Sequence, residues 1–176
     1  VGALIMAFGL FAFTKFGKTE SDVSPAQSAF EATVAAAVAS GEDKPVSVVT
    51  GERKITVYKS ATCGCCKSWI AYLEKAGYEV ESVDETDMSM VKAKLGVSRG
   101  VASCHTGVIN GYVVEGHVPV EDIERMLATK PGIVGISAPG MPVGSPGMEQ
   151  GDRKDPYDVV AFGSSGETAV FASYNK

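Results

Sequence analysis

The sequence has few cysteines, few histidines and no basic cluster, and each shortage excludes a class of protein. Its 176 residues include four Cys, two His and one Trp. Four clustered cysteines cannot form a disulfide framework, because bridges between near neighbours constrain little chain. The net charge of −5, with no run of Lys and Arg, argues against a nucleic-acid partner. With 45% hydrophobic and 21% charged residues, the chain suits one globular domain with extensions.

Long apolar runs are also scarce, and the one at the start of the sequence is short. Residues 1–16 are almost all apolar, with the first charge at Lys15. About 14 uncharged residues fall short of the roughly 20 that span a bilayer as a helix. We interpret residues 1–18 as a signal anchor or a signal-peptide remnant, and prefer an uncleaved anchor because no small-residue cleavage site follows. A buried helix of the main domain is the alternative, although the segment has no polar face.

The rest of the chain divides by composition into a spacer, a core domain and a C-terminal part. Residues 19–51 are rich in Ser, Ala, Glu and Val, with a weak helix pattern at 27–39, and we expect a spacer without chemistry of its own. Residues 52–130 alternate between strand and helix patterns, which indicates an α/β domain in the order β-α-β-α-β-β-α. The expected strands are 54–59, 78–83, 106–109 and 112–115, and the expected helices are 65–76, 87–95 and 120–128.

Residues 131–176 are expected to form a stiff loop and a β-hairpin that packs on the domain. Nine of the eighteen residues at 131–148 are Gly or Pro, which predicts an extended loop and excludes a helix or central strand. Residues 157–162 and 168–174 have strand patterns around a Gly-Ser-Ser-Gly turn.

The most informative stretch is Thr62-Cys63-Gly64-Cys65-Cys66, at the corner between the first strand and the first helix. Cys63 and Cys66 share one face once a helix begins there, and the amides of its first turn stabilise thiolates. A dithiol redox site needs only two sulfurs, so the third one, Cys65, suggests a soft metal. The alternative is that Cys66 is a core residue, since it continues an apolar helical stripe.

The element order, with a cysteine pair at that corner, resembles the thioredoxin and glutaredoxin fold over about residues 54–130. In that fold a cis-proline faces the redox pair, and here its place holds Ser103-Cys104-His105-Thr106. The resemblance therefore implies that Cys104 and His105 lie opposite Cys63 and Cys66. Cys104 and His105, which can both bind a metal, would then stand where the fold has a proline, which cannot.

Several separated motifs follow one another along residues 55–174. In order, they are Tyr58-Lys59-Ser60 with the cysteine cluster, Ser103-Cys104-His105-Thr106, Glu115-Gly116-His117-Val118-Pro119, Gly140-Met141-Pro142 and Ser145-Pro146-Gly147-Met148-Glu149. Together they resemble the CopG-type periplasmic copper-resistance proteins. The resemblance implies a thioredoxin-like domain that binds several Cu(I) ions through bridging cysteines and interconverts Cu(I) and Cu(II).

The candidate ligands are compatible with copper on physical grounds. Soft thiolates select Cu(I) or Zn, and bridging Cu(I) ions would neutralise four thiolate charges one for one. A closed mononuclear Zn site is the competing assignment, although adjacent cysteines bring sulfurs close enough to share metals. Each His could instead be a structural residue, and Met148 could simply pack over the domain surface. The candidate metal ligands are Cys63, Cys65, Cys66, Cys104, His105, His117 and Met148.

We therefore expect a periplasmic or cell-envelope copper protein, anchored to the inner membrane by its N-terminal segment. Its partners would be copper ions and other envelope copper-handling or electron-donor proteins, and either an oxidoreductase or a copper buffer is consistent with the residues. The alternative is a thiol-disulfide oxidoreductase that uses Cys63 and Cys66, with Cys65 and Cys104 as an auxiliary pair. The missing proline counts against this alternative.

Overall fold

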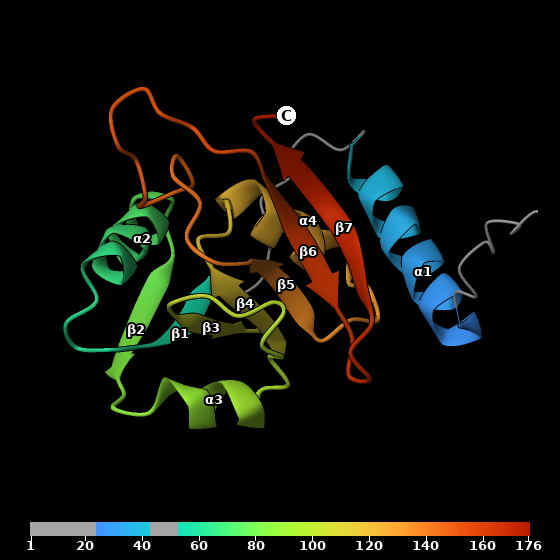
Figure 1. The fold of residues 1–176 in the computed structure, drawn as a ribbon, viewed down its shortest axis with the longest axis horizontal. Helices are drawn as coiled ribbons and strands as arrows, with labels where there is room; N and C mark the ends of the chain where they lie inside the picture. The colour runs from blue at the N-terminus through green and yellow to red at the C-terminus, as the bar shows by residue number, and fades with distance from the viewer. Residues whose placement is uncertain (1–23, 43–52) are drawn as a thin grey trace, which may run out of the picture.

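The computed structural model describes residues 24–42 and 53–176, and these form a mixed seven-stranded sheet with four helices (Figure 1). The strand order is β2-β1-β3-β4-β5-β6-β7. The pairs β1/β2 and β4/β5 are parallel, and the other neighbours are antiparallel. The elements are α1 (Pro25–Glu42), β1 (Lys54–Lys59), α2 (Gly64–Lys75), β2 (Glu79–Asp84), α3 (Met88–Lys94), β3 (Thr106–Ile109), β4 (Tyr112–Gly116), α4 (Val120–Thr129), β5 (Gly135–Ala138), β6 (Tyr157–Phe162) and β7 (Thr168–Tyr174).

The predicted β-α-β-α-β-β-α order from β1 to α4 is confirmed, with element ends within one or two residues. Local signals explain this agreement. The Asp87 side chain caps α3 by accepting hydrogen bonds from the backbone N–H groups of Ser89 and Met90. The Asn110-Gly111 pair turns β3 into β4, and the two strands pair from Thr106 with Glu115 to Ile109 with Tyr112.

The prediction that residues 131–148 contain no central strand is wrong. β5 lies inside this stretch, is buried along its whole length, and pairs with β4 on one side and β6 on the other. A Cβ atom at Gly135 would lie 2.0 Å from the carbonyl oxygen of Val113, so only glycine lets β5 approach β4 here. None of the four prolines that argued against a strand lies in β5, since Pro131 precedes it and Pro139, Pro142 and Pro146 follow it.

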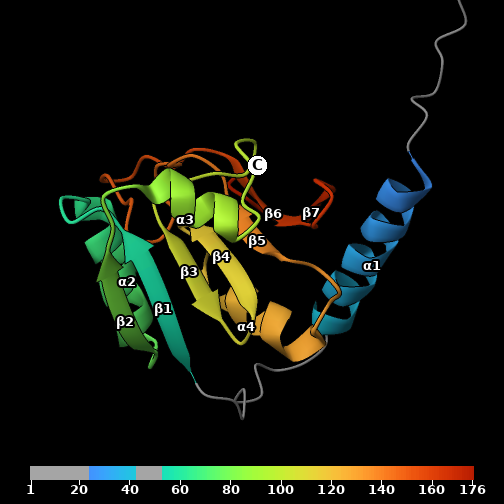
Figure 2. The same cartoon turned by 90° about the horizontal axis from the view of Figure 1, so that it is seen from below.

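Two hydrophobic clusters lie on opposite faces of the sheet. Val114 belongs to the larger cluster, with side chains of α2 and α4, whereas its neighbour Val113 belongs to the smaller one beneath the segment after α3. Successive residues of a strand point to opposite faces, so α3 and α2/α4 cover different sides. Figure 2 shows this arrangement, with α3 on the near side of the strands.

The helix expected within the spacer is docked on the domain. Phe30, Val34 and Ala37 of α1 are buried, and Phe30 and Val34 join the cluster that contains Phe171 of β7. Figure 1 places α1 beside β7, at the opposite end of the molecule from α2. The apolar segment at residues 1–18 lies outside the described residues. Within 24–42 and 53–176, no helix has the length and hydropathy to cross a membrane.

Candidate metal centre

The cysteine cluster lies where β1 turns into α2. Cys63 is the N-cap of α2, and its backbone N–H donates to the carbonyl of Ser60 at 3.1 Å. Cys63 and Cys66 form a disulfide across the first turn, with their Cα atoms 5.4 Å apart. Cys66 is fully buried on the stripe of α2 that also buries Trp69 and Leu73, as the sequence pattern predicts. Cys66 is therefore both a core residue and a member of the sulfur cluster.

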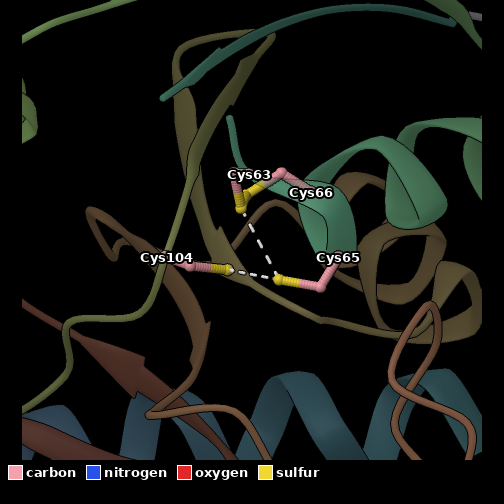
Figure 3. A group of neighbouring side chains, drawn as sticks. All are labelled: Cys63, Cys65, Cys66 and Cys104. Carbon is pink, nitrogen blue, oxygen red and sulfur yellow. Dashed lines mark hydrogen bonds between the residues drawn. A yellow bond between two sulfur atoms is a disulfide. The ribbon is translucent and has the colours of Figure 1, made fainter. Parts of the chain in front are cut away.

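Cys104, which is 38 residues beyond Cys66 in the sequence, completes the cluster. The Sγ atom of Cys65 lies 3.5 Å from that of Cys63 and 3.7 Å from that of Cys104. All four sulfurs lie within 4.8 Å of one another. In Figure 3, dashed lines join the sulfur of Cys65 to Cys63 of the disulfide and to Cys104. The prediction that this downstream thiol meets the other three is confirmed.

Both histidines of the chain lie against Cys104. The Sγ atom of Cys104 is 3.2 Å from Nδ1 of His105 and 3.2 Å from Nε2 of His117. Nδ1 of His117 lies 2.8 Å from the carbonyl oxygen of Pro146, which can only accept, so Nδ1 carries the proton and Nε2 offers its lone pair toward Cys104. Both imidazoles are fully buried, and their ring centroids lie 4.9 Å apart.

Burial determines the protonation of these groups. It holds the pKa of His105 well below its usual range, and the neighbouring His117 and Lys92 act in the same direction. Burial also lowers the pKa of His117, although the hydrogen bond to Pro146 opposes this. Both rings are therefore neutral near pH 7 and can act as metal ligands. Burial raises the pKa of the Cys104 thiol to about 12, with a further contribution from Cys65.

Trp69 and the Gly/Pro-rich loop form the walls of the centre. The indole of Trp69 lies against the ring of His105, with centroids 4.4 Å apart, and its N–H donates to the carbonyl of Val118 at 3.0 Å. A Cβ at Gly147 would be 2.7 Å from the backbone nitrogen of Trp69, so the loop touches the backbone of α2 there. Met148 is the next residue, is half-buried, and donates its N–H to the carbonyl of Ser145. Its role as a ligand stays a prediction.

The donor atoms fit a shared soft metal. Sulfurs around one tetrahedral ion at about 2.3 Å are about 3.8 Å apart, close to the 3.5 and 3.7 Å spacings of Cys65. A second group of donors consists of Cys104, His105 and His117, whose ligand atoms also lie within 4.8 Å of one another. Nε2 of His105 is buried and has no hydrogen-bond partner in the described part of the chain. The arrangement therefore offers sulfur and imidazole donors from one cluster, in which Cys66 and both histidines are buried and the other three cysteines are half-buried.

Comparisons with known proteins agree with this geometry. Two solved structures, named "Copper resistance protein copG- Form 2" and "Copper resistance protein copG- Form 1", are each 52% identical to the chain with a TM-score of 0.67. The chain covers 98% of each, and the match covers 69% and 70% of this chain. The chain belongs to the CopG family of copper resistance proteins.

A family model also matches the part of this CopG-family chain that contains Cys104. Residues 101–148 match a family model described as "Protein of unknown function, DUF411". That range contains four of the predicted ligands of this CopG-family chain, Cys104, His105, His117 and Met148, whereas the other three cysteines precede it. No curated protein matches the sequence.

Glu115, which was not among the predicted site residues, also shapes the centre. Glu115 of β4 is fully buried and accepts a hydrogen bond from the backbone N–H of Ser103, next to Cys104. A charged residue inside the apolar strand Tyr112–Gly116, opposite Thr106, is the signal that could have identified it.

Proposed function

We propose that this protein binds copper in the cell envelope as a cysteine-bridged Cu(I) cluster and acts in copper resistance. The ligands would be the four cysteines, with His105, His117 and Met148 as further donors. One observation carries the proposal: all four sulfurs, from two distant segments, lie within 4.8 Å of one another. Thiolates prefer Cu(I) among biological metals, and the relatives at 52% identity are named copper resistance proteins.

The same thiols can interconvert Cu(I) and Cu(II). Two Cu(II) ions each take one electron from the thiolates of Cys63 and Cys66, which join as a disulfide, so two Cu(I) ions are formed and any thiol protons leave to solvent. The proximity that allows the Cys63–Cys66 disulfide supports this step. Cys65 and Cys104 remain free in that state and keep their donor atoms for the reduced ions.

Anaerobic titration of the reduced protein with Cu(I), in competition with a chromogenic chelator, tests the proposal. We expect a sharp endpoint above one copper per chain that is lost in Cys104→Ser, because Cys104 is the one cysteine of the four that lies outside the Cys63–Cys66 segment. An endpoint at one zinc ion per chain, with no uptake of several Cu(I) ions, would instead indicate a mononuclear Zn site.

Met148→Leu tests the thioether, with Met90→Leu as its matched control. Met90 is 55% exposed on α3 and is not a predicted ligand. A thioether ligand predicts weaker Cu(I) binding in Met148→Leu alone. Equal affinity of both variants and the wild type would remove Met148 from the ligand set.

A second candidate function, thiol-disulfide exchange, is favoured by the Cys63–Cys66 disulfide. In exchange chemistry one thiolate attacks a substrate disulfide and the second thiol resolves the mixed disulfide, which needs no metal. Efficient reduction of insulin by the dithiol form, without copper uptake, would support this function over copper binding. Copper uptake with negligible insulin reduction would exclude it.

We propose further that residues 52–130 form a thioredoxin-like unit in the periplasm, attached to the inner membrane through residues 1–18. The β-α-β-α-β-β-α order, with a parallel β1/β2 pair and the β3/β4 hairpin, supports the fold assignment. The apolar composition of residues 1–18 supports the location. Fractionation of cells that express the full chain tests it, and recovery in the cytosolic fraction would contradict it.

A further inference from the structure

One buried carboxylate organises the segment that carries Cys104. The side chain of Glu115 has no exposed surface, and it accepts three hydrogen bonds: from the backbone N–H of Ser103 at 2.6 Å, from the hydroxyl of Thr106 at 2.7 Å and from Nζ of Lys92 at 2.5 Å. The first two donors immediately flank Cys104 and His105. One carboxylate thus holds both ends of the two-residue segment that supplies a thiol and an imidazole to the metal centre.

Lys92 links this carboxylate to α3. Its Nζ also donates to the hydroxyl of Thr106 at 3.0 Å, so lysine, threonine and glutamate form a closed triangle of hydrogen bonds. The Lys92 side chain is only 13% exposed, although α3 contains no buried residue. A buried charge pair is weak evidence for stability, because well-packed apolar residues often do as well. The position that the Lys92–Glu115 pair gives to the segment with Cys104 and His105 is the better explanation of why the pair is present.

Glu115 does not act as a ligand itself. It belongs to neither group of metal-competent donors, and each of its oxygens already accepts a hydrogen bond. A backbone hydrogen bond also links β4 to this segment, since the N–H of Gly116 donates to the carbonyl of His105 at 3.0 Å. β4 therefore acts on the centre through the position of Cys104 and His105.

We propose that Glu115, paired with Lys92, is a positioning residue that holds Cys104 at bridging distance from Cys65 and His105 against Cys104. This inference rests on the proposed copper function for its consequence, although the placement of the thiol is independent of copper. Outer residues that orient metal ligands typically change metal affinity about 10- to 100-fold when mutated. We expect a loss of Cu(I) affinity in that range for Glu115→Gln.

A copper-free measurement tests the positioning directly. In a Cys63→Ser/Cys66→Ser background only Cys65 and Cys104 remain, and diamide oxidises them to a disulfide by accepting their two protons and two electrons. Alkylation and mass spectrometry follow the loss of free thiol with time. We expect Glu115→Gln to slow this reaction by about tenfold or more, in line with the loss of ligand orientation. Lys92→Met should act in the same direction, and Lys92→Arg should stay close to the background rate.

Glu124→Gln is the matched control for a purely structural effect. Glu124 has a 10% exposed side chain and pairs with Arg53, which precedes β1 at the strand end remote from Cys63. Glu115→Gln should slow the reaction of Cys65 with Cys104 far more than Glu124→Gln does at a comparable loss of stability. Equal rates in the two variants would overturn the proposal. If Glu115→Gln does not fold, Thr106→Val removes the hydrogen bonds of Thr106 to Glu115 and to Lys92 at nearly constant shape, and an unchanged rate there would also overturn the proposal.

The two readouts separate this proposal from the proposed function. If the wild-type protein takes up no copper but the Cys65–Cys104 rate depends on Glu115, the positioning role is supported and the copper function is refuted. If the wild-type protein binds several Cu(I) ions and the rate does not depend on Glu115, the copper function stands and the positioning role is refuted.

Discussion

Gly147 offers a sharp test of how the Gly/Pro-rich loop closes the metal centre. A Cβ atom at this position would meet three backbone atoms of α2: the nitrogen of Trp69 at 2.7 Å, the carbonyl carbon of Ser68 at 3.1 Å and the Cα of Trp69 at 3.1 Å. Backbone atoms cannot rotate away as a side chain can. Gly147→Ala must therefore move the loop away from α2.

The magnitude follows from two separate costs. Gly147 has a φ of +79°, where a Cβ costs about 1–2 kcal/mol. Forcing an extra methyl into a packed contact costs about 1–3 kcal/mol more. Gly151 has a φ of +58° and nothing within 4 Å of its would-be Cβ, so Gly151→Ala carries only the first cost. The difference between the two variants should be about 1–3 kcal/mol in the free energy of unfolding.

The displacement also affects the metal centre, because the carbonyl of the adjacent Pro146 accepts the hydrogen bond that fixes the His117 tautomer. We expect Cu(I) affinity to fall about tenfold or more in Gly147→Ala and to stay unchanged in Gly151→Ala. Denaturant unfolding of the reduced, copper-free variants and chelator competition measure the two effects. Equal stability and equal affinity of the two alanine variants would refute the described packing of the loop on α2.

Two further predictions concern regions outside the metal centre. Burial raises the pKa of Asp122 to about 6 from its usual value of 3.8, so its contribution to stability is full below about pH 3.8 and is lost as the pH rises through about 6. The free energy of unfolding of the wild type, relative to that of Asp122→Asn, should fall by about 3 kcal/mol from acid to neutral pH, and a pH-independent difference would contradict this assignment. Val34→Asp should detach α1 and lower the free energy of unfolding by about 1.5–3 kcal/mol, because Val34 is buried against the domain. Hydrogen exchange in α1 should become faster while copper binding stays unchanged, and Ala35→Asp, on the exposed side, should have little effect. Unchanged exchange in Val34→Asp would refute the docking of α1.

Local signals in the sequence were sufficient for most elements of the fold but not for β5. A strand such as Thr106–Ile109 has a turn pair beside it, and α3 has a capping aspartate, so each can be recognised from a few neighbouring residues. Gly135–Ala138 has no such pattern, because its stability comes from β4 and β6 on either side. The glycine that seemed to exclude a strand is required by the close approach of Val113, which no local pattern reveals.

The residues of the candidate site likewise differ in how far the sequence predicted them. The cysteine motif and the two histidines could be selected by residue type, and the resemblance of the fold predicted that Cys104 would meet the cluster. Glu115 carried a weaker signal, a single charge inside an apolar strand, and its partner Lys92 reaches it from α3, 23 residues earlier in the sequence. Proximity of chemically obvious groups is thus easier to infer than the polar network that positions them.

The disulfide and the proposed Cu(I) cluster compete for the same sulfurs. While Cys63 and Cys66 are joined, neither can supply a thiolate, and the remaining donors of the proposed set are Cys65, Cys104, His105, His117 and Met148. Imidazole suits Cu(II), whereas an all-thiolate set selects Cu(I). Under the proposed function, the two-electron oxidation of one cysteine pair would therefore both reduce two copper ions and lower the number of thiolate donors from four to two, while both imidazoles remain. Redox state and copper preference would be coupled because Cys65 and Cys104 stay in contact in the oxidised form, 3.7 Å apart.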